Sequence, residues 1–189
     1  MRALSLPLVA FFLLAIEAGV SPYPAAGVGF TVDSTADAVD ADPGDGACAS
    51  ETGECTLRAA VQETNALAGA DVITLPAGTY ELAIPGRAED AAATGDLDIT
   101  DDLTITGAGR DATVIDGGQR DRLIHAFLFF HNELQVDLVN LTVRNGKAEL
   151  VPTIGETDNG GGLYLGDGVS ATLTDVKVTE NSSTSHGGG

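Results

Sequence analysis

The sequence predicts an all-β fold, a parallel solenoid, and three observations lead to this. From Asp71 onward, aliphatic residues alternate with polar neighbours in short runs that end at Gly, Asn or Asp, which is typical of strands. No helical period is present in this part of the chain. Similar runs also recur: residues 138–143 superpose on residues 173–178 at an offset of 35, and residues 103–105 superpose on residues 141–143 at an offset of 38.

In a solenoid, each strand stacks on its counterpart in the next repeat, and inward aliphatic side chains form a continuous core. Asparagines at the ends of the runs are expected to bond along the stack. An antiparallel sandwich also uses short strands and is the alternative, although it accounts less well for the recurrence. We expect six inward side chains in three stacked pairs: Leu103 and Ile105, then Leu141 and Val143, then Val176 and Val178.

Residues 1–26 have the layout of a secretory signal peptide. Met1-Arg2 gives a positive start, residues 3–16 form an uncharged apolar run, and small residues follow. This run is too short for an ordinary membrane span, and an uncleaved anchor is the alternative. No second apolar run of membrane length follows, so we expect a secreted or cell-surface protein whose mature chain does not insert into a membrane.

Residues 27–70 are expected to form an N-terminal cap region that contains one helix. A short strand at 28–32 is followed by a loop that is rich in acids and contains no base. Thr56 stands where a helix N-cap would, directly before the Ala-rich segment 57–67, whose apolar residues fall on one face. The pattern therefore predicts an amphipathic helix over 57–67.

The chain contains two cysteines, Cys48 and Cys55, separated by six residues. In an exported protein, two nearby cysteines in a polar loop most often form a disulfide. A metal pair is the alternative, but it lacks the further Cys or His ligands that a zinc site needs. We expect the disulfide, with a structural role.

The acidic loop raises the question of a calcium site. Asp40, Asp42 and Asp45 surround a Pro-Gly turn, and carboxylate oxygens are the ligands that Ca²⁺ prefers. The spacing does not follow the twelve-residue EF-hand pattern, because no Glu closes it at the required position. Two interpretations stay open, a calcium site at these three residues and a solvated acidic loop. No other cofactor is expected.

The charge balance excludes two classes of partner. With 28 acidic and 9 basic residues, the net charge is −19. A nucleic-acid-binding surface needs clustered Lys and Arg, and a polybasic membrane patch needs them as well. Lys147 and Lys177 are the two lysines of the chain. We therefore expect no nucleic-acid partner.

Residues 55–60, Cys-Thr-Leu-Arg-Ala-Ala, resemble the Cys-Ser-Leu-Arg-Glu-Ala motif that names the CSLREA domain. Thr56 replaces the Ser of the motif and keeps the cap, whereas Ala59 replaces the Glu and removes the capping-box partner. The resemblance covers roughly residues 30–189. It continues through 65–66, 73–80, 95–99, 103–107 and 115–118, and through the Gly-Gly-Gly units at 160–162 and 187–189.

The CSLREA domain lies at the N-terminus of secreted, mostly bacterial or archaeal proteins that form a right-handed β-helix. The resemblance therefore implies a right-handed, pectate-lyase-like parallel β-helix. Residues 27–70 would cap it, and residues 71–189 would form its coils. The chain stops at His186-Gly187-Gly188-Gly189, which looks like the opening of another coil, so we expect an N-terminal fragment. The resemblance implies no defined activity, because a fold alone does not establish function.

Candidate catalytic residues come from the same resemblance. Polysaccharide lyases of this fold pair calcium-binding carboxylates with an arginine base, and the related hydrolases use paired aspartates. Asp is also common at strand ends for local hydrogen bonding, and this is the alternative. Single histidines such as His125 are expected to be structural, and Phe127, Phe129 and Phe130 to lie in the core or on a sugar-stacking surface. The candidates are Asp96, Asp98, Asp101, Asp102, Asp116, Arg87, Arg110, Arg120, Arg122 and Arg144.

Three functions stay open. A non-catalytic exported module, structural or adhesive at the cell surface, is the leading interpretation, because Lys is nearly absent and no coherent catalytic group stands out. A lyase or hydrolase that acts on acidic polysaccharide is the second, and a carbohydrate-binding module without turnover is the third. The net charge of −19 repels polyuronates unless a cation bridges the two.

Overall fold

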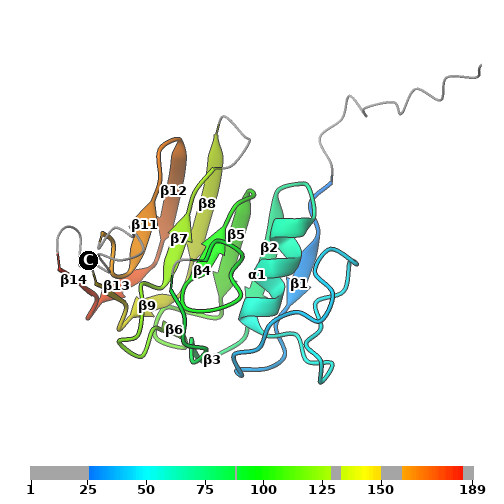
Figure 1. The fold of residues 1–189 in the computed structure, drawn as a ribbon, viewed down its shortest axis with the longest axis horizontal. Coiled ribbons are helices and arrows are strands. Elements are labelled where there is room, and N and C mark those ends of the chain that lie inside the picture. Colours follow the sequence, from blue (N-terminus) through cyan, green and yellow to red (C-terminus); the bar gives the residue numbers. More distant parts are fainter. Residues whose placement is uncertain (1–25, 88, 129–132, 150–158, 185–189) are drawn as a thin grey trace, which may run out of the picture.

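The computed structural model describes residues 26–87, 89–128, 133–149 and 159–184, and it consists mostly of strands with one short helix (Figure 1). Every strand pair in these residues is parallel. The predicted all-β class is confirmed. Nearly all of the predicted signal segment lies outside the described residues, as do Phe129, Phe130 and His186.

The strands form four parallel sheets. Sheet A has the order β1 (Gly29–Thr31), β2 (Asp71–Leu75), β5 (Leu103–Gly107), β8 (Leu134–Val139) and β12 (Val169–Thr174). Sheet B has the order β3 (Gly78–Glu81), β6 (Thr113–Asp116), β9 (Thr142–Arg144) and β13 (Lys177–Thr179). Sheet C has the order β4 (Leu97–Ile99), β7 (Ile124–Ala126) and β11 (Leu163–Leu165), and sheet D pairs β10 (Lys147–Ala148) with β14 (Ser182–Ser183).

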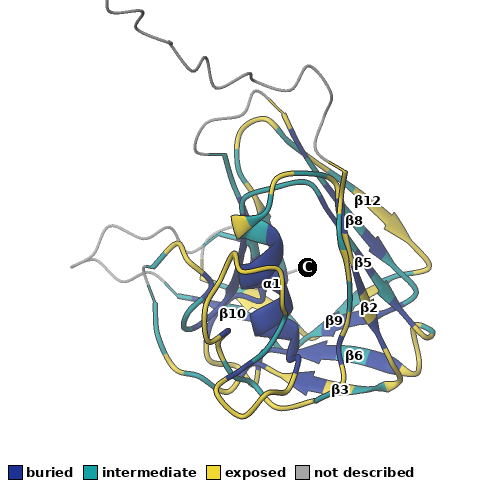
Figure 2. Cartoon of the chain, turned by 90° about the vertical axis from the view of Figure 1, so that its right-hand side faces the viewer, coloured by how far each residue is buried: buried dark blue, intermediate teal, exposed yellow. Residues whose placement is uncertain are grey.

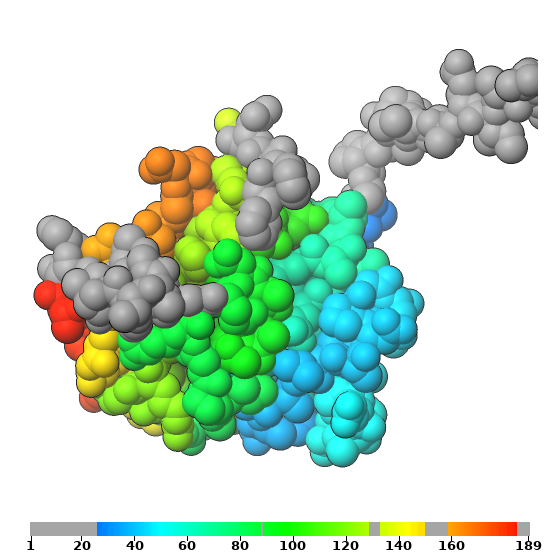
Figure 3. Space-filling model, in the orientation of Figure 1, coloured from blue at the N-terminus to red at the C-terminus, as the bar shows by residue number. Residues whose placement is uncertain are grey.

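The chain visits these sheets in a recurring order. It runs through β2 in sheet A, β3 in sheet B and β4 in sheet C, and then returns to sheet A with β5. The strands β5, β6 and β7 repeat this path beside the first three. Seen from the end that carries the helix, the strands of sheet A lie behind one another on one side, and those of sheet B lie on another (Figure 2). The surface follows the same order, from blue and cyan residues at one end to orange and red at the other (Figure 3).

The interior is a stack of aliphatic side chains in register. Ile73 pairs with Ile105, and Ile105 pairs with Leu138, and all three are fully buried. Leu173 continues this row in β12 but is 45% exposed, because β12 is the edge strand of sheet A. Alternation within each strand therefore places one set of residues in the core, as the period of two predicts.

The predicted stacking is right at one offset and wrong at the other. Leu173 pairs with Leu138, and Val178 pairs with Val143, as the offset of 35 requires. Ile105 pairs with Leu138 and not with Val143, whose partner on the other side is Ile115. The offset of 38 matched a strand of sheet A to a strand of sheet B, because both read as two aliphatic residues around a threonine. Four of the six expected side chains are buried, and Val176 and Val178 are half-buried.

The turns recur as well. Asn140 and Asp175, 35 residues apart, both have a left-handed backbone with φ of 55° and 52°. The expected bonding of asparagines along the stack takes a different form from the one predicted. Asn145 donates to both carboxylate oxygens of Asp116, and the Asn181 side chain bonds the backbone of residues 143 and 146. The amides therefore join neighbouring strands through other groups and not through one another.

Helix α1 (Leu57–Ala66) confirms the predicted helix, and the Thr56 side chain accepts a hydrogen bond from the Ala59 N–H. Its contacts are with β2 and β4. The Cys48–Cys55 disulfide is also confirmed, with Cα atoms 5.0 Å apart. Among the described residues, no helix is long and apolar enough to span a membrane.

Candidate functional site

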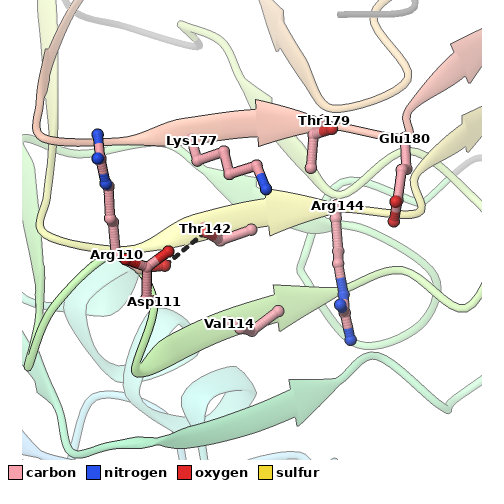
Figure 4. A pocket seen from close by; sticks show the side chains of 8 residues that line it. All are labelled: Arg110, Asp111, Val114, Thr142, Arg144, Lys177, Thr179 and Glu180. Carbon is pink, nitrogen blue, oxygen red and sulfur yellow. Dashed lines mark hydrogen bonds between the residues drawn. The ribbon is translucent and has the colours of Figure 1, made fainter.

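A pocket of about 160 Å³ lies over sheet B, on the side of its strands that faces away from the core (Figure 4). The strands β6, β9 and β13 supply its floor, because residues that alternate with the buried Ile115, Val143 and Thr113 point outward. Three of its side chains are basic. Its lining consists of Arg110, Asp111, Val114, Thr142, Arg144, Lys177, Thr179 and Glu180.

The three basic side chains differ in how they are paired. Arg110 makes an exposed ion pair with Asp175, with 3.2 Å between Nη1 and Oδ1. Arg144 places its Nε 2.8 Å from Oδ2 of Asp116. Lys177 has no ion pair within the described part of the chain, and its side chain extends over Thr142 in Figure 4. Lys177 is therefore the charge in this pocket that is available to an anionic ligand.

Asp116 sits at the end of β6 and anchors one wall of the pocket. Burial by itself would raise the pKa of Asp116. Hydrogen bonds from the Gly118 N–H, from Asn145 and from Arg144 outweigh burial, so the pKa of this carboxyl is lower than usual. The carboxylate thus stays ionised and holds Arg144 at the rim, and its oxygens are occupied by these donors.

The other candidate acids and arginines do not converge on this pocket. Asp101 and Asp102 accept backbone N–H groups of Gly69 and Gln135 at the start of sheet A strands. Arg120 makes an exposed pair with Glu81. Arg87 donates to backbone carbonyls of residues 120 and 149. These residues bond groups that lie 32 to 62 residues away in the chain, and thus join neighbouring segments of the fold.

Beside sheet C, the remaining candidates Asp96, Asp98 and Arg122 lie together with three further titratable side chains in a group here called the sheet C cluster. It contains Asp90, Asp96, Asp98, Asp121, Arg122 and His125. Asp96 forms an ion pair with Nε of Arg122, and Asp98 bonds Nδ1 of His125 at 3.0 Å. Asp121 accepts the Arg122 N–H through Oδ1, whereas its Oδ2 is buried and has no hydrogen-bond partner among the described residues.

Asp96, Asp98 and Asp121 of the sheet C cluster have raised pKa values. Burial raises the pKa of Asp96 to about 6, with a further rise from Asp98, and Arg122 opposes this. Burial also raises the pKa of Asp98 to about 7, and the charges of Glu89 and Asp90 add to it. The pKa of Asp121 rises to about 7 through burial and the charge of Asp96. Such values suit general acids, but Asp98 is fully buried and Asp96 nearly so, which keeps a polymeric substrate away from both.

His125 lies within an aromatic stack on sheet C. Its ring centroid is 4.4 Å from that of Phe127 and 5.3 Å from that of Tyr164, which occupies the same register position on β11. Arg122 stands 5.6 Å from the Tyr164 ring centre. The sequence predicts a structural role for His125 but does not predict its hydrogen bond with Asp98, because the two residues are 27 positions apart in the chain.

Two of the three carboxylates of the predicted calcium site, those of Asp40 and Asp45, accept backbone hydrogen bonds within their own loop. The carboxylate of Asp40 accepts the N–H groups of Asp42 and Ala49, each at 2.9 Å, and Asp45 accepts the N–H of Ala47. In the described ranges, Asp90, Asp98 and His125 are the group whose ligand atoms come within reach of one ion, and Asp40, Asp42 and Asp45 do not form one. Calcium binding at these three stays a prediction that this geometry does not favour.

Comparison with family models, with curated proteins and with solved structures gives no match. The two sites therefore rest on their own geometry. Arg110 and Arg144 are among the candidates that the sequence indicates, but Lys177 is not, because nothing in the sequence pattern separates an outward strand lysine from any other surface charge.

Proposed function

We propose that the chain is an exported right-handed parallel β-helix that acts without catalysis, as a surface module that binds acidic carbohydrate through the pocket over sheet B. The β-helix part of this proposal is supported by the parallel pairing and by the recurring path through sheets A, B and C. Crossovers between parallel strands are right-handed in nearly all proteins. Helix α1 and the acidic loop would cap the first coil.

Export is supported by the disulfide, since disulfides persist in oxidising compartments. The apolar segment at residues 3–16 suits a signal peptide, as the sequence predicts. Both features, together with the resemblance to the CSLREA domain, support a site of action outside the cytoplasm.

The observation that carries the binding function is the convergence of Arg110, Arg144 and Lys177 on a chain with only 9 basic residues against 28 acids. Three basic side chains against two acidic ones, Asp111 and Glu180, give the pocket lining a net charge of +1, on a chain whose net charge of −19 repels polyanions. Its volume of about 160 Å³ is below the roughly 300–1,000 Å³ of sites for drug-sized ligands. It therefore suits one charged residue of an extended ligand, such as one uronate of a polymer.

The test is calorimetric titration with trigalacturonate at low salt, with neutral maltotriose as the comparison ligand. We expect the acidic sugar alone to bind, with an affinity that falls as salt is added because exposed charges are screened. Lys177→Ala should weaken binding about tenfold, the loss of one charge-assisted contact. Lys147→Ala is the matched control, because Lys147 pairs with Glu149 outside the pocket. Equal effects of the two lysine variants, or equal binding of the neutral sugar, would contradict the proposal.

A lyase is the second candidate, and the same convergence favours it, since arginine and lysine against a substrate carboxylate are what β-elimination of a uronate requires. An absorbance assay for unsaturated products separates the two. We expect no turnover of polygalacturonate with or without calcium, because ion pairs with Asp175 and Asp116 keep Arg110 and Arg144 protonated and so prevent either from acting as the base. Turnover that Arg144→Ala abolishes would replace the binding function with the enzymatic one.

A further inference from the structure

We propose that Asp90, Asp98 and His125 bind one divalent transition-metal ion of the Zn²⁺ class beside sheet C. One donor atom from each of these residues lies within 4.8 Å of the other two. This site is separate from the basic pocket over sheet B, and no residue is shared between them.

The backbone places two of the ligands side by side. Asp98 on β4 and His125 on β7 occupy the same register position of neighbouring parallel strands, so their side chains project together. Oδ1 of Asp98 is 3.0 Å from Nδ1 of His125, and Oδ2 of Asp98 is fixed by the Ala92 N–H at 3.1 Å. The buried carboxylate is thus held in one orientation before an ion arrives.

The third ligand comes from the segment that precedes β4. Glu89 shapes this segment by accepting the N–H groups of Ala91 and Thr94. Asp90 is exposed, so an ion can enter from solvent at this point and keep water in its remaining positions. The imidazole is oriented by its stack on Phe127, at 4.4 Å between ring centres. Orientation of a ligand by its surroundings is a regular feature of metal sites.

The charge of the site also favours a cation. Within the residues that the structure describes, neither Asp90 nor Asp98 forms an ion pair with Lys or Arg, and Arg122 is engaged with Asp96. An ion would neutralise two neighbouring carboxylates, one of which is fully buried. The partner of Asp98 is His125, which carries no charge when it coordinates a metal, so the ion supplies the positive charge that offsets the cost of the buried carboxylate.

The donor set decides the class of ion. One imidazole nitrogen with two carboxylate oxygens suits Zn²⁺ and Co²⁺, whereas Ca²⁺ takes six to eight oxygen ligands. Three protein ligands with room for water match an open, tetrahedral site.

The experiment is calorimetric titration of the disulfide-intact chain with Zn²⁺, repeated with Co²⁺ and monitored by visible absorption. The variants are Asp90→Asn and His125→Gln. Asp90 is exposed, so we expect its variant to keep the fold, and circular dichroism verifies this. Asp42→Asn is the matched control, an exposed acid of the other candidate loop.

We expect one equivalent of Zn²⁺ to bind, a rise in melting temperature on binding, and a visible Co²⁺ band. Asp90→Asn and His125→Gln should each lower the affinity at least tenfold and remove the rise in melting temperature, while Asp42→Asn stays within twofold of the unaltered chain. The absence of Zn²⁺ binding would overturn the proposal. Unchanged affinity in Asp90→Asn, or an equal loss in Asp42→Asn, would do so too.

Discussion

Arg58 and Asp37 form a buried, two-point ion pair that ties helix α1 to the acidic loop. Nε of Arg58 is 2.6 Å from Oδ1 of Asp37, and Nη2 is 3.2 Å from Oδ2. The remaining donors of Arg58 reach the carbonyl oxygens of Ala92, Gly95 and Asp96. A fully buried guanidinium with every bond directed at another segment joins three parts of the chain.

Arg58→Ala should lower the free energy of unfolding by about 3–5 kcal/mol, because it leaves Asp37 charged, buried and without its partner. Urea denaturation measures this. Arg120→Ala is the control, since its exposed pair with Glu81 contributes at most about 1 kcal/mol. Equal losses in the two variants would mean that Arg58 has no special role.

Glu63→Gln should lower the free energy of unfolding by about 1–3 kcal/mol, because one of its two backbone N–H partners loses its acceptor. The buried Glu63 carboxylate accepts the N–H groups of Gly44 and Gly46, each at 2.5 Å. Faster amide exchange at these two glycines would accompany the loss. Glu51→Gln, an exposed change, should leave both quantities unaltered.

Asp121→Asn should stabilise the chain above neutral pH but not in acid. The folded pKa of Asp121 is raised to about 7, above the unfolded value of about 3.9. Below about pH 4 the group is protonated in both states and contributes nothing. As the pH rises towards 7, the unfolded chain releases the proton first, so this group makes stability fall, and the fall ends above pH 7.

The free energy of unfolding of the variant, relative to that of the unaltered chain, should therefore rise by up to about 4 kcal/mol between about pH 4 and 7. Urea unfolding at a series of pH values measures the difference. The exposed change Asp167→Asn should follow the unaltered curve. A difference in unfolding free energy that stays constant across the pH range would show that ionising Asp121 carries no extra cost in the folded chain.

Reduction of the Cys48–Cys55 disulfide should lower the free energy of unfolding by about 2–3 kcal/mol, the chain-entropy value for so short a loop. The double variant Cys48→Ser with Cys55→Ser should match the reduced chain. Alkylation of the native protein without reductant should label no thiol. Two labelled thiols in the native chain would contradict the bond.

Local features of the fold were predictable from sequence, and distant pairings were predictable only in part. The helix begins at Leu57 and could be predicted from its N-cap Thr56 and its apolar face, both of which are local features. The offset of 35 was visible because β8 and β9 repeat together in β12 and β13. The match at 38 failed because a three-residue run does not tell sheet A from sheet B.

The candidate sites depend on spacings that vary along the chain. His125 lies 27 residues after Asp98, its partner on the neighbouring strand, whereas Ile105 lies 32 after Ile73. No single period therefore brings the members of the sheet C cluster together. The buried polar side chains of α1 were also missed, since Arg58 and Glu63 read as the solvent face of an amphipathic helix, and only the folded chain shows that other segments cover them.

The Asn65 side chain makes the kind of hydrogen bonds to β4 that a neighbouring strand would make. Its side-chain amide donates to the carbonyl of Asp98 at 2.7 Å and accepts the N–H of Thr100 at 2.9 Å, along the open side of the strand that begins sheet C. An open edge of this kind invites pairing with another chain. A single helical side chain thus closes the edge to self-association, and its loss would expose a template for aggregation while the interior of the protein stays intact.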